Sequence, residues 1–130
     1  MDTFKLEILT PNGVIYNGDA LSATLPGEEG EFGVLAYHSN LTTLLQAGVI
    51  EIEIPNISVE SVCVDWGVVK VDDLLVTVLV DGAVAIIGTT ENEIAEAIDE
   101  AKNLITSVSD SAAVIASVSA KLETAAQKLM

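Results

Sequence analysis

The sequence predicts a β + α protein, with an N-terminal ten-stranded β-sandwich followed by a C-terminal antiparallel two-helix hairpin. Two observations support this prediction. Up to residue 88, short apolar runs are separated by turn residues at spacings of roughly 8–12 residues or less, which is typical of a sandwich or barrel. From residue 89 onward, apolar residues recur at helical spacing instead. We therefore expect two domains, a sandwich over 1–88 and a hairpin over 89–130.

The predicted strands follow one another with recognisable turns between them. Residues 3–9 and 20–25 alternate apolar and polar side chains, so each is expected to bury one face. Asn17-Gly18 is expected to turn the chain, and residues 26–29 are expected to form a polar loop. Asp81-Gly82 is the strongest hairpin dipeptide. The remaining strands are expected over 14–16, 34–35, 41–45, 49–54, 57–64, 68–71, 74–80 and 84–87.

The helical part carries a clear start signal. Thr90 and Glu93 have the spacing of a capping box, in which the Thr90 hydroxyl accepts a hydrogen bond from the Glu93 amide. Residues 107–111 interrupt the apolar stripe, and Ser109 or Asp110 is expected to cap a second helix. Because the connection is short, the two helices should be antiparallel. The residues expected at the hairpin interface are Ile94, Ile98, Ala101, Ile105, Ile115, Val118, Leu122 and Leu129.

The charge balance excludes some partners. The chain has 20 acidic residues against five lysines and no arginine, which gives a formal net charge of −15. Nucleic-acid binding requires basic patches that neutralise phosphates, and anionic lipid headgroups would be repelled. No apolar run approaches the roughly 20 residues of a membrane helix, so direct lipid insertion is not expected. A partner protein must be basic or must be met through apolar contacts.

The sequence shows no set of catalytic side chains. The sandwich part has no Ser/His/Asp or Cys/His arrangement, so we expect a protein that is not an enzyme. Cys63, the only cysteine, lies in an apolar run and is expected to be a small buried hydrophobe. His38 is the only histidine, and one histidine does not make a metal site. No cofactor is expected.

Residues 30–45 carry the most specific pattern, two glycines three apart followed by two apolar runs. The stretch resembles the G-E-L-G-I-x-P-x-H-x-P-L segment of the epsilon subunit of F-type ATP synthase. Ala36 and Asn40 replace the two prolines of that segment. Residues 43–50, 66–71 and 74–81 resemble further family segments in the right order, and the total length also agrees. The matching positions of the first segment are Gly30, Glu31, Gly33, His38 and Leu41.

The resemblance implies a rotor subunit that supports ATP synthesis driven by protons, with sodium as the alternative coupling ion, and that has no catalytic residue. Such a subunit is peripheral, on the cytoplasmic face of the bacterial inner membrane, and its sandwich links the gamma subunit to the c-ring. Its hairpin folds against the sandwich or extends along gamma into the catalytic alpha/beta head, where it blocks ATP hydrolysis. The resemblance places Glu31 opposite the c-ring and His38 near gamma. Lys121 and Lys128 are the hairpin cations expected to meet an acidic surface of the head.

Other interpretations of these residues remain open. Glu31 and His38 also fit simple solvated loop residues. Some bacterial members of the family bind ATP through a motif that contains an arginine, which this chain lacks, so tight nucleotide binding is not expected. The alternative function is a free-standing acidic β-sandwich that binds a small ligand or a divalent cation. That alternative does not explain the capped helical hairpin.

Overall fold

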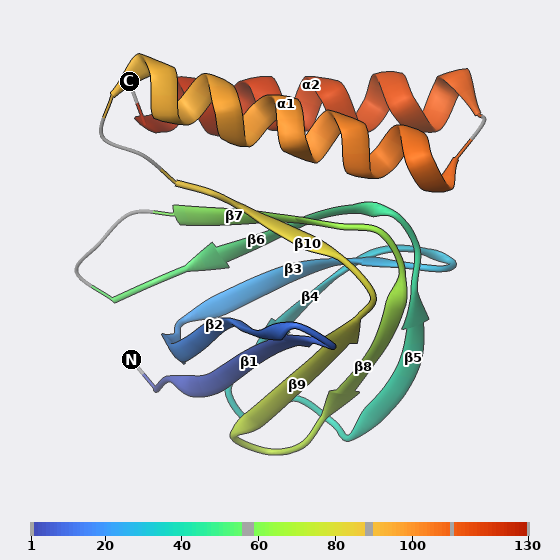
Figure 1. The fold of residues 1–130 in the computed structure, drawn as a ribbon. Helices are drawn as coiled ribbons and strands as arrows, with labels where there is room; N and C mark the ends of the chain where they lie inside the picture. Colours follow the sequence, from blue (N-terminus) through green and yellow to red (C-terminus); the bar gives the residue numbers. More distant parts are fainter. Residues whose placement is uncertain (1, 56–58, 88–89, 110, 130) are drawn as a thin grey trace.

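The computed structural model describes residues 2–55, 59–87, 90–109 and 111–129 (Figure 1). Within these ranges ten strands are followed by two helices, which confirms the predicted fold class. The elements are β1 (Phe4–Thr10), β2 (Gly13–Ala20), β3 (Ser22–Gly27), β4 (Gly30–Leu35), β5 (Leu41–Leu45), β6 (Gly48–Glu53), β7 (Val59–Val64), β8 (Gly67–Val71), β9 (Leu75–Val80), β10 (Ala83–Ile86), α1 (Glu91–Val108) and α2 (Ala112–Leu129).

The strands are hydrogen-bonded in the order β10-β7-β6-β3-β5-β8-β9-β1-β2, with β4 paired to the other side of β3. This continuous sheet folds into two facing layers, and the change of layer falls between β3 and β5 (Figure 1). There the pairing is reduced to Gly27 opposite Leu45. The β1–β9 pair is parallel and the other pairs are antiparallel.

The sandwich core fills the space between the two layers. Leu6 and Ile8 of β1 belong to this core together with Ile50 and Ile52 of β6, and all four side chains are fully buried. In β1 the buried residues alternate with exposed or half-buried neighbours, as expected for a strand with one face in the core. Burying each such side chain contributes about 1.5–3 kcal/mol.

A second apolar cluster lies on the outside of the layer formed by β6, β7 and β10. The helical hairpin covers this face (Figure 1). Val49 and Cys63 pack toward the helices, while their neighbours Ile50 and Val62 pack into the sandwich core. Strands β6 and β7 are therefore buried on both faces along part of their length, which explains the consecutive apolar residues at 49–50 and 62–64.

Two predicted turns are wrong. Asn17 and Gly18 lie inside β2, opposite Glu7 and Leu6, because β1 and β2 form a long antiparallel pair. The predicted loop over 26–29 is shorter than expected, since Pro26 and Gly27 end strand β3. In both cases long-range pairing with a neighbouring strand overrides the local turn preference of glycine and proline.

The Asp81-Gly82 hairpin prediction is also wrong. Strands β9 and β10 do not pair, since β9 pairs with β8 and β1 whereas β10 pairs with β7. The buried carboxylate of Asp65 binds this connection instead. It accepts hydrogen bonds from the backbone N–H of Gly82 at 2.9 Å and of Trp66 at 2.7 Å. Asp65 thus fixes the point at which the chain crosses between layers.

The predicted cap of α1 is confirmed, whereas the residue that caps α2 differs from the prediction. The Thr90 hydroxyl accepts a 3.2 Å hydrogen bond from the amide of Glu93, which confirms the first cap. In the second helix the cap is Ser111, whose hydroxyl accepts from the Val114 amide at 3.3 Å. Ser109 instead accepts from the amide of Ser111, and Asp110 lies outside the described residues.

Candidate functional site

The two residues expected to contact partners lie near opposite ends of β4, so the structure does not bring them together. Glu31 is the second residue of β4, and His38 follows the last residue of that strand by three positions. The sandwich therefore presents two separate ends, and each has its own chemistry. An exposed apolar sheet face provides a third candidate surface.

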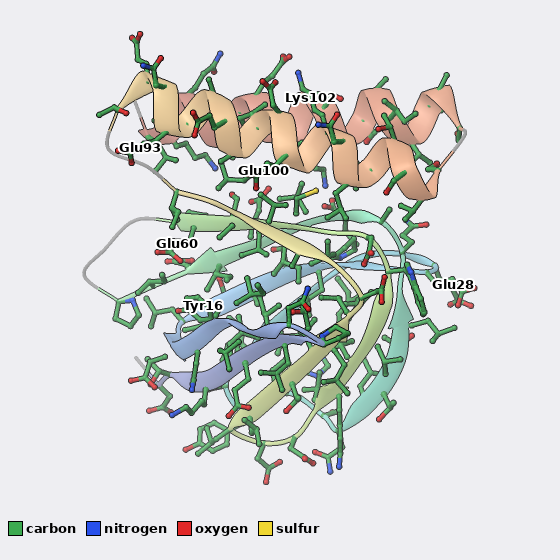
Figure 2. The ribbon with its side chains drawn as sticks, viewed as in Figure 1. Tyr16, Glu28, Glu60, Glu93, Glu100 and Lys102 are labelled. Atoms are coloured by element: carbon green, nitrogen blue, oxygen red, sulfur yellow. The ribbon has the colours of Figure 1, made fainter. Side chains whose placement is uncertain are left out.

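Glu31 belongs to an acidic tip, defined here as Glu28, Glu29 and Glu31, at the turn between β3 and β4. Figure 2 shows Glu28 at the far end of this turn, pointing away from the sandwich. Gly27 and Gly30 make the tight turn possible. A Cβ at Gly27 would lie 2.7 Å from the carbonyl oxygen of Gly30, and Gly30 has a φ of +132°.

The carboxylate of Glu31 is paired across the two domains. The Lys121 ammonium of α2 donates a hydrogen bond to Oε2 of Glu31. A second hairpin lysine, Lys102, lies 3.5 Å from Glu123 and joins α1 to α2. Lys128 lies in the last turn of α2, where a cation interacts favourably with the helix dipole. The expectation that Lys121 and Lys128 meet an acidic partner remains a prediction, and in this structure Lys121 is bound to the sandwich.

His38 lies in the loop between β4 and β5, which is held against the turn between β8 and β9. The backbone N–H of Tyr37 donates to the carbonyl of Asp73 at 2.8 Å, and that of His38 donates to Leu35 at 3.2 Å. Nδ1 of His38 lies 2.7 Å from the carbonyl oxygen of Ser39. The exposed apolar residues at this end, called the loop-end patch, are Leu35, Tyr37, Leu74 and Leu75.

The third surface is an apolar row across the outer face of four strands. Leu44 of β5 pairs with Val68 of β8, Val68 pairs with Leu79 of β9, and Leu79 pairs with Leu9 of β1. Leu79 is 54% exposed, and Trp66 beside the row is 57% exposed. A hollow of about 420 Å³ lies among Trp66, Leu9, Val68 and Leu79. We call Leu9, Leu44, Val68 and Leu79 the outer row.

Sequence reasoning did not single out the outer row. Its signal is present in β9, where residues 74–80 are apolar on both faces of the strand. A strand with one solvated face should alternate, so a continuous apolar run in an antiparallel sheet indicates a second contact surface. The sequence does not give the register of the strands, so it does not show which residues of the neighbouring strands lie beside those of β9.

The predicted hairpin interface residues all lie in the second apolar cluster, which we call the hairpin seam. Ile94, Ile98, Ala101 and Ile105 of α1 are buried there, as are Val118 and Leu122 of α2. Ile115 and Leu129 are partly buried against the same cluster. The seam also includes Val49, Cys63 and Ile86 of the sandwich, so it joins the two helices to each other and to the sandwich.

Cys63 lies beneath α1 within the seam, as a fully buried hydrophobe, which confirms its predicted role. Its thiol donates to the carbonyl oxygen of Ala101, with an Sγ–O distance of 3.8 Å. Burial, and secondarily the charge of Asp65, raise the pKa of the Cys63 thiol to about 12. Because the thiolate is the nucleophile, this thiol is unreactive while the hairpin covers it.

Within the described residues, His, Cys, Asp and Glu side chains form no group of three or more that could hold a metal ion. The cation-binding alternative therefore gains no support from the part of the chain that the structure describes. Over those same ranges, no helix has both the length and the apolar character needed to cross a membrane.

Comparison with known proteins agrees with this architecture. The family model for the β-sandwich domain of ATP synthase delta/epsilon chains matches residues 3–86. The chain is 64% identical to the ATP synthase epsilon chain of Sulfurimonas denitrificans, over 100% of both chains. It is 55% identical to that of Nitratiruptor, over 98% of both. A chain of the Euglena gracilis mitochondrial ATP synthase shares the fold, with a TM-score of 0.62 and 22% identity over 97% of this chain and 80% of that one. The chain belongs to the family of ATP synthase epsilon chains.

Proposed function

We propose that this chain joins the gamma subunit to the membrane c-ring in the rotor of an F-type ATP synthase. As an epsilon chain, it is a subunit of the rotary complex and not itself the catalyst. The observation that best supports the proposal is the outer row, an exposed aliphatic surface on a rigid sheet. A monomeric soluble protein rarely leaves such a patch uncovered.

We assign the outer row and Trp66 to the contact with gamma. The net charge of −15 makes an apolar interface the favourable way to meet a partner that is not strongly basic. Aromatic and aliphatic side chains in a hollow are typical anchors of a protein interface. The loop-end patch beside His38 would extend this contact, in agreement with the resemblance that places His38 near gamma.

We assign the acidic tip to the c-ring. Two exposed carboxylates on the turn, Glu28 and Glu29, and a third beside it in β4, Glu31, form a compact anionic projection, which suits a basic loop of a partner. The chain would then be a peripheral subunit on the cytoplasmic face of the membrane. This side of the membrane follows from the resemblance and from the bacterial relatives.

We also propose that the hairpin regulates ATP hydrolysis by leaving the sandwich and extending toward the alpha/beta head. The apolar stripe of the helices serves both positions, so it does not select between them. Exposed ion pairs contribute only about 0.2–1 kcal/mol each, and the hairpin has three lysines. Inhibition should therefore be weak and sensitive to salt. Deleting residues 89–130 should raise ATP hydrolysis by the assembled enzyme modestly.

Capture of gamma tests the rotor assignment. The variants Leu44→Gln and Leu79→Gln remove apolar contact from the outer row without adding charge. Each buried leucine contributes about 1.5–3 kcal/mol, so each change should weaken gamma binding at least about tenfold. Ile87→Gln is the matched control, because Ile87 is 56% exposed and follows β10, which lies in the layer opposite the outer row. Unchanged affinity in both outer-row variants would remove the support for this surface.

A further inference from the structure

The contact between the hairpin and the sandwich is mostly apolar, with one ion pair across it. Three ion pairs occur among the residues that the structure describes. Lys70–Asp72 lies within the sandwich, and Lys102–Glu123 lies within the hairpin. The third, Lys121–Glu31, connects residues 90 positions apart and joins the two domains. This pair is a direct link between a hairpin cation and a sandwich carboxylate.

The packing around Lys121 is open. Its side chain lines a hollow of about 230 Å³, which Pro26, Gly48 and Ser117 among others also line. It also lines a second hollow of about 170 Å³, together with Glu51, Thr124 and Lys128 among others. Apolar contacts are interrupted at both places, so α2 meets the tip of the β3–β4 pair through Lys121. The Lys121 side chain is only 33% exposed, against 48% for Glu31, so solvent screens the pair incompletely.

The net charges of the two domains oppose docking, whereas their apolar contacts favour it. The sandwich part has 13 acids and two lysines, and the helical part has seven acids and three lysines. Both domains are therefore negative, and docking the hairpin brings like charges together. A hairpin cation placed on a sandwich carboxylate opposes this repulsion where the surfaces touch.

We propose that the Lys121–Glu31 ion pair is a latch that holds the helical hairpin against the sandwich. The latch opens when Lys121 or Glu31 is neutralised, when salt screens the pair, or when another cation takes the Glu31 carboxylate. The latch acts within a single chain. Its consequence for the assembly rests on the proposed function: a basic c-ring group and Lys121 would compete for Glu31, so rotor contact at the tip would release the hairpin.

Cys63 provides a direct readout of the latch in the isolated full-length chain. It is the only cysteine, and α1 covers it, so a water-soluble maleimide reacts only after the hairpin moves away. When the hairpin recloses faster than the reagent reacts, the labelling rate reports the fraction of open molecules. The assay needs neither gamma nor the c-ring, so its outcome is independent of the gamma-capture experiment.

Lys121→Gln and Glu31→Gln should each raise the labelling rate about 1.5- to fivefold at low salt, the range expected for a partly exposed pair. The double variant should rise no further than the larger single change, because each removes the same contact. Sodium chloride should accelerate labelling of the parent chain more than of the variants. Exchanging the charges with Glu31→Lys and Lys121→Glu should restore slow labelling.

Lys102→Gln is the matched control. It removes the same charge from the hairpin but breaks the Lys102–Glu123 pair, which does not reach the sandwich. Figure 2 shows Lys102 on the side of the hairpin away from the sandwich. The proposal is overturned if Lys121→Gln labels no faster than Lys102→Gln, or if the effects of the two latch variants multiply. It is also overturned if Cys63 of the parent chain labels as fast as in urea.

Discussion

The sandwich core and the hairpin seam bury apolar surface in different ways. The core joins large side chains from two layers, such as Leu6, Ile8 and Ile50, and each is fully buried. The seam depends partly on alanines of the helices, and hollows interrupt it beside Lys121. Small side chains bury less area, so they contribute less docking free energy. The difference suits a sandwich that carries a hairpin able to move away from it, as the proposed regulation of ATP hydrolysis would require.

Removing the hairpin entirely gives the largest test of this comparison. Residues 1–88 contain all the described strands, so the fragment should keep a near-ultraviolet circular dichroism spectrum and unfold cooperatively. It should also be prone to association, because Val49, Cys63 and Ile86 lose their cover. A spectrum typical of an unfolded chain would show that the sandwich depends on the seam.

Truncating one side chain in each region sharpens the comparison. Leu122→Ala empties a fully buried position in the seam and should weaken hairpin docking by about 2–4 kcal/mol. Labelling of Cys63 should accelerate well over tenfold, the factor to which 1.4 kcal/mol corresponds. The midpoint of the urea-induced unfolding transition of the sandwich should not change.

Ile8→Ala is the matched change in the sandwich core. Ile8 is also fully buried, and its truncation should lower the unfolding free energy of the sandwich itself by about 2–5 kcal/mol. If Leu122→Ala lowers the sandwich transition as much as Ile8→Ala does, the two regions form one cooperative unit and the comparison fails.

Alkaline pH tests the seam through Cys63. Its pKa is raised in the folded chain from 9.0 to about 12, so folding favours the protonated thiol. That stability is fully present below pH 9 and is lost as the pH rises from 9 toward 12. Between pH 8 and pH 10 the free energy of unfolding should fall in both proteins. The fall should be larger in the parent chain than in Cys63→Ala, by on the order of 1 kcal/mol. Urea titrations of both proteins at the two pH values measure this difference, and equal losses would contradict it.

The smallest expected effect concerns the start of the hairpin. Thr90→Ala removes the hydroxyl that accepts from the Glu93 amide, and an exposed helix cap contributes about 0.5–1 kcal/mol. Cys63 labelling should rise about two- to fivefold, whereas Thr90→Ser, which keeps the hydroxyl, should label like the parent chain. A rise in the serine variant as large as in the alanine variant would argue against the cap.

Tyr16 provides a comparison within the sandwich alone. Partial burial, with smaller effects from the charges of Glu60 and Asp19, raises the pKa of Tyr16. Figure 2 shows Tyr16 and Glu60 on the same side of the sandwich. Burial of the hydroxyl thus outweighs the neighbouring carboxylates in raising this pKa.

Much of the fold could be predicted from the sequence because its signals are local. Alternation over residues 3–9 and 20–25 reflects strands with one face in the core. The Thr90–Glu93 spacing and the apolar stripe of α1 depend only on helix geometry. The position of Cys63 in an apolar run indicated burial correctly. Each of these features arises within a few residues of chain.

Tertiary structure decided the features that join distant residues. The register placed Leu9, Leu44, Val68 and Leu79 in one row, and no local pattern specifies register. The amide of Gly82 donates a hydrogen bond to Asp65, 17 residues earlier in the chain, and β10 pairs with β7. These long-range contacts override the hairpin preference of Asp81-Gly82. The Lys121–Glu31 contact required the hairpin to fold back on the acidic tip. Local propensity determines which elements form, whereas long-range pairing and side-chain packing determine which of their residues meet.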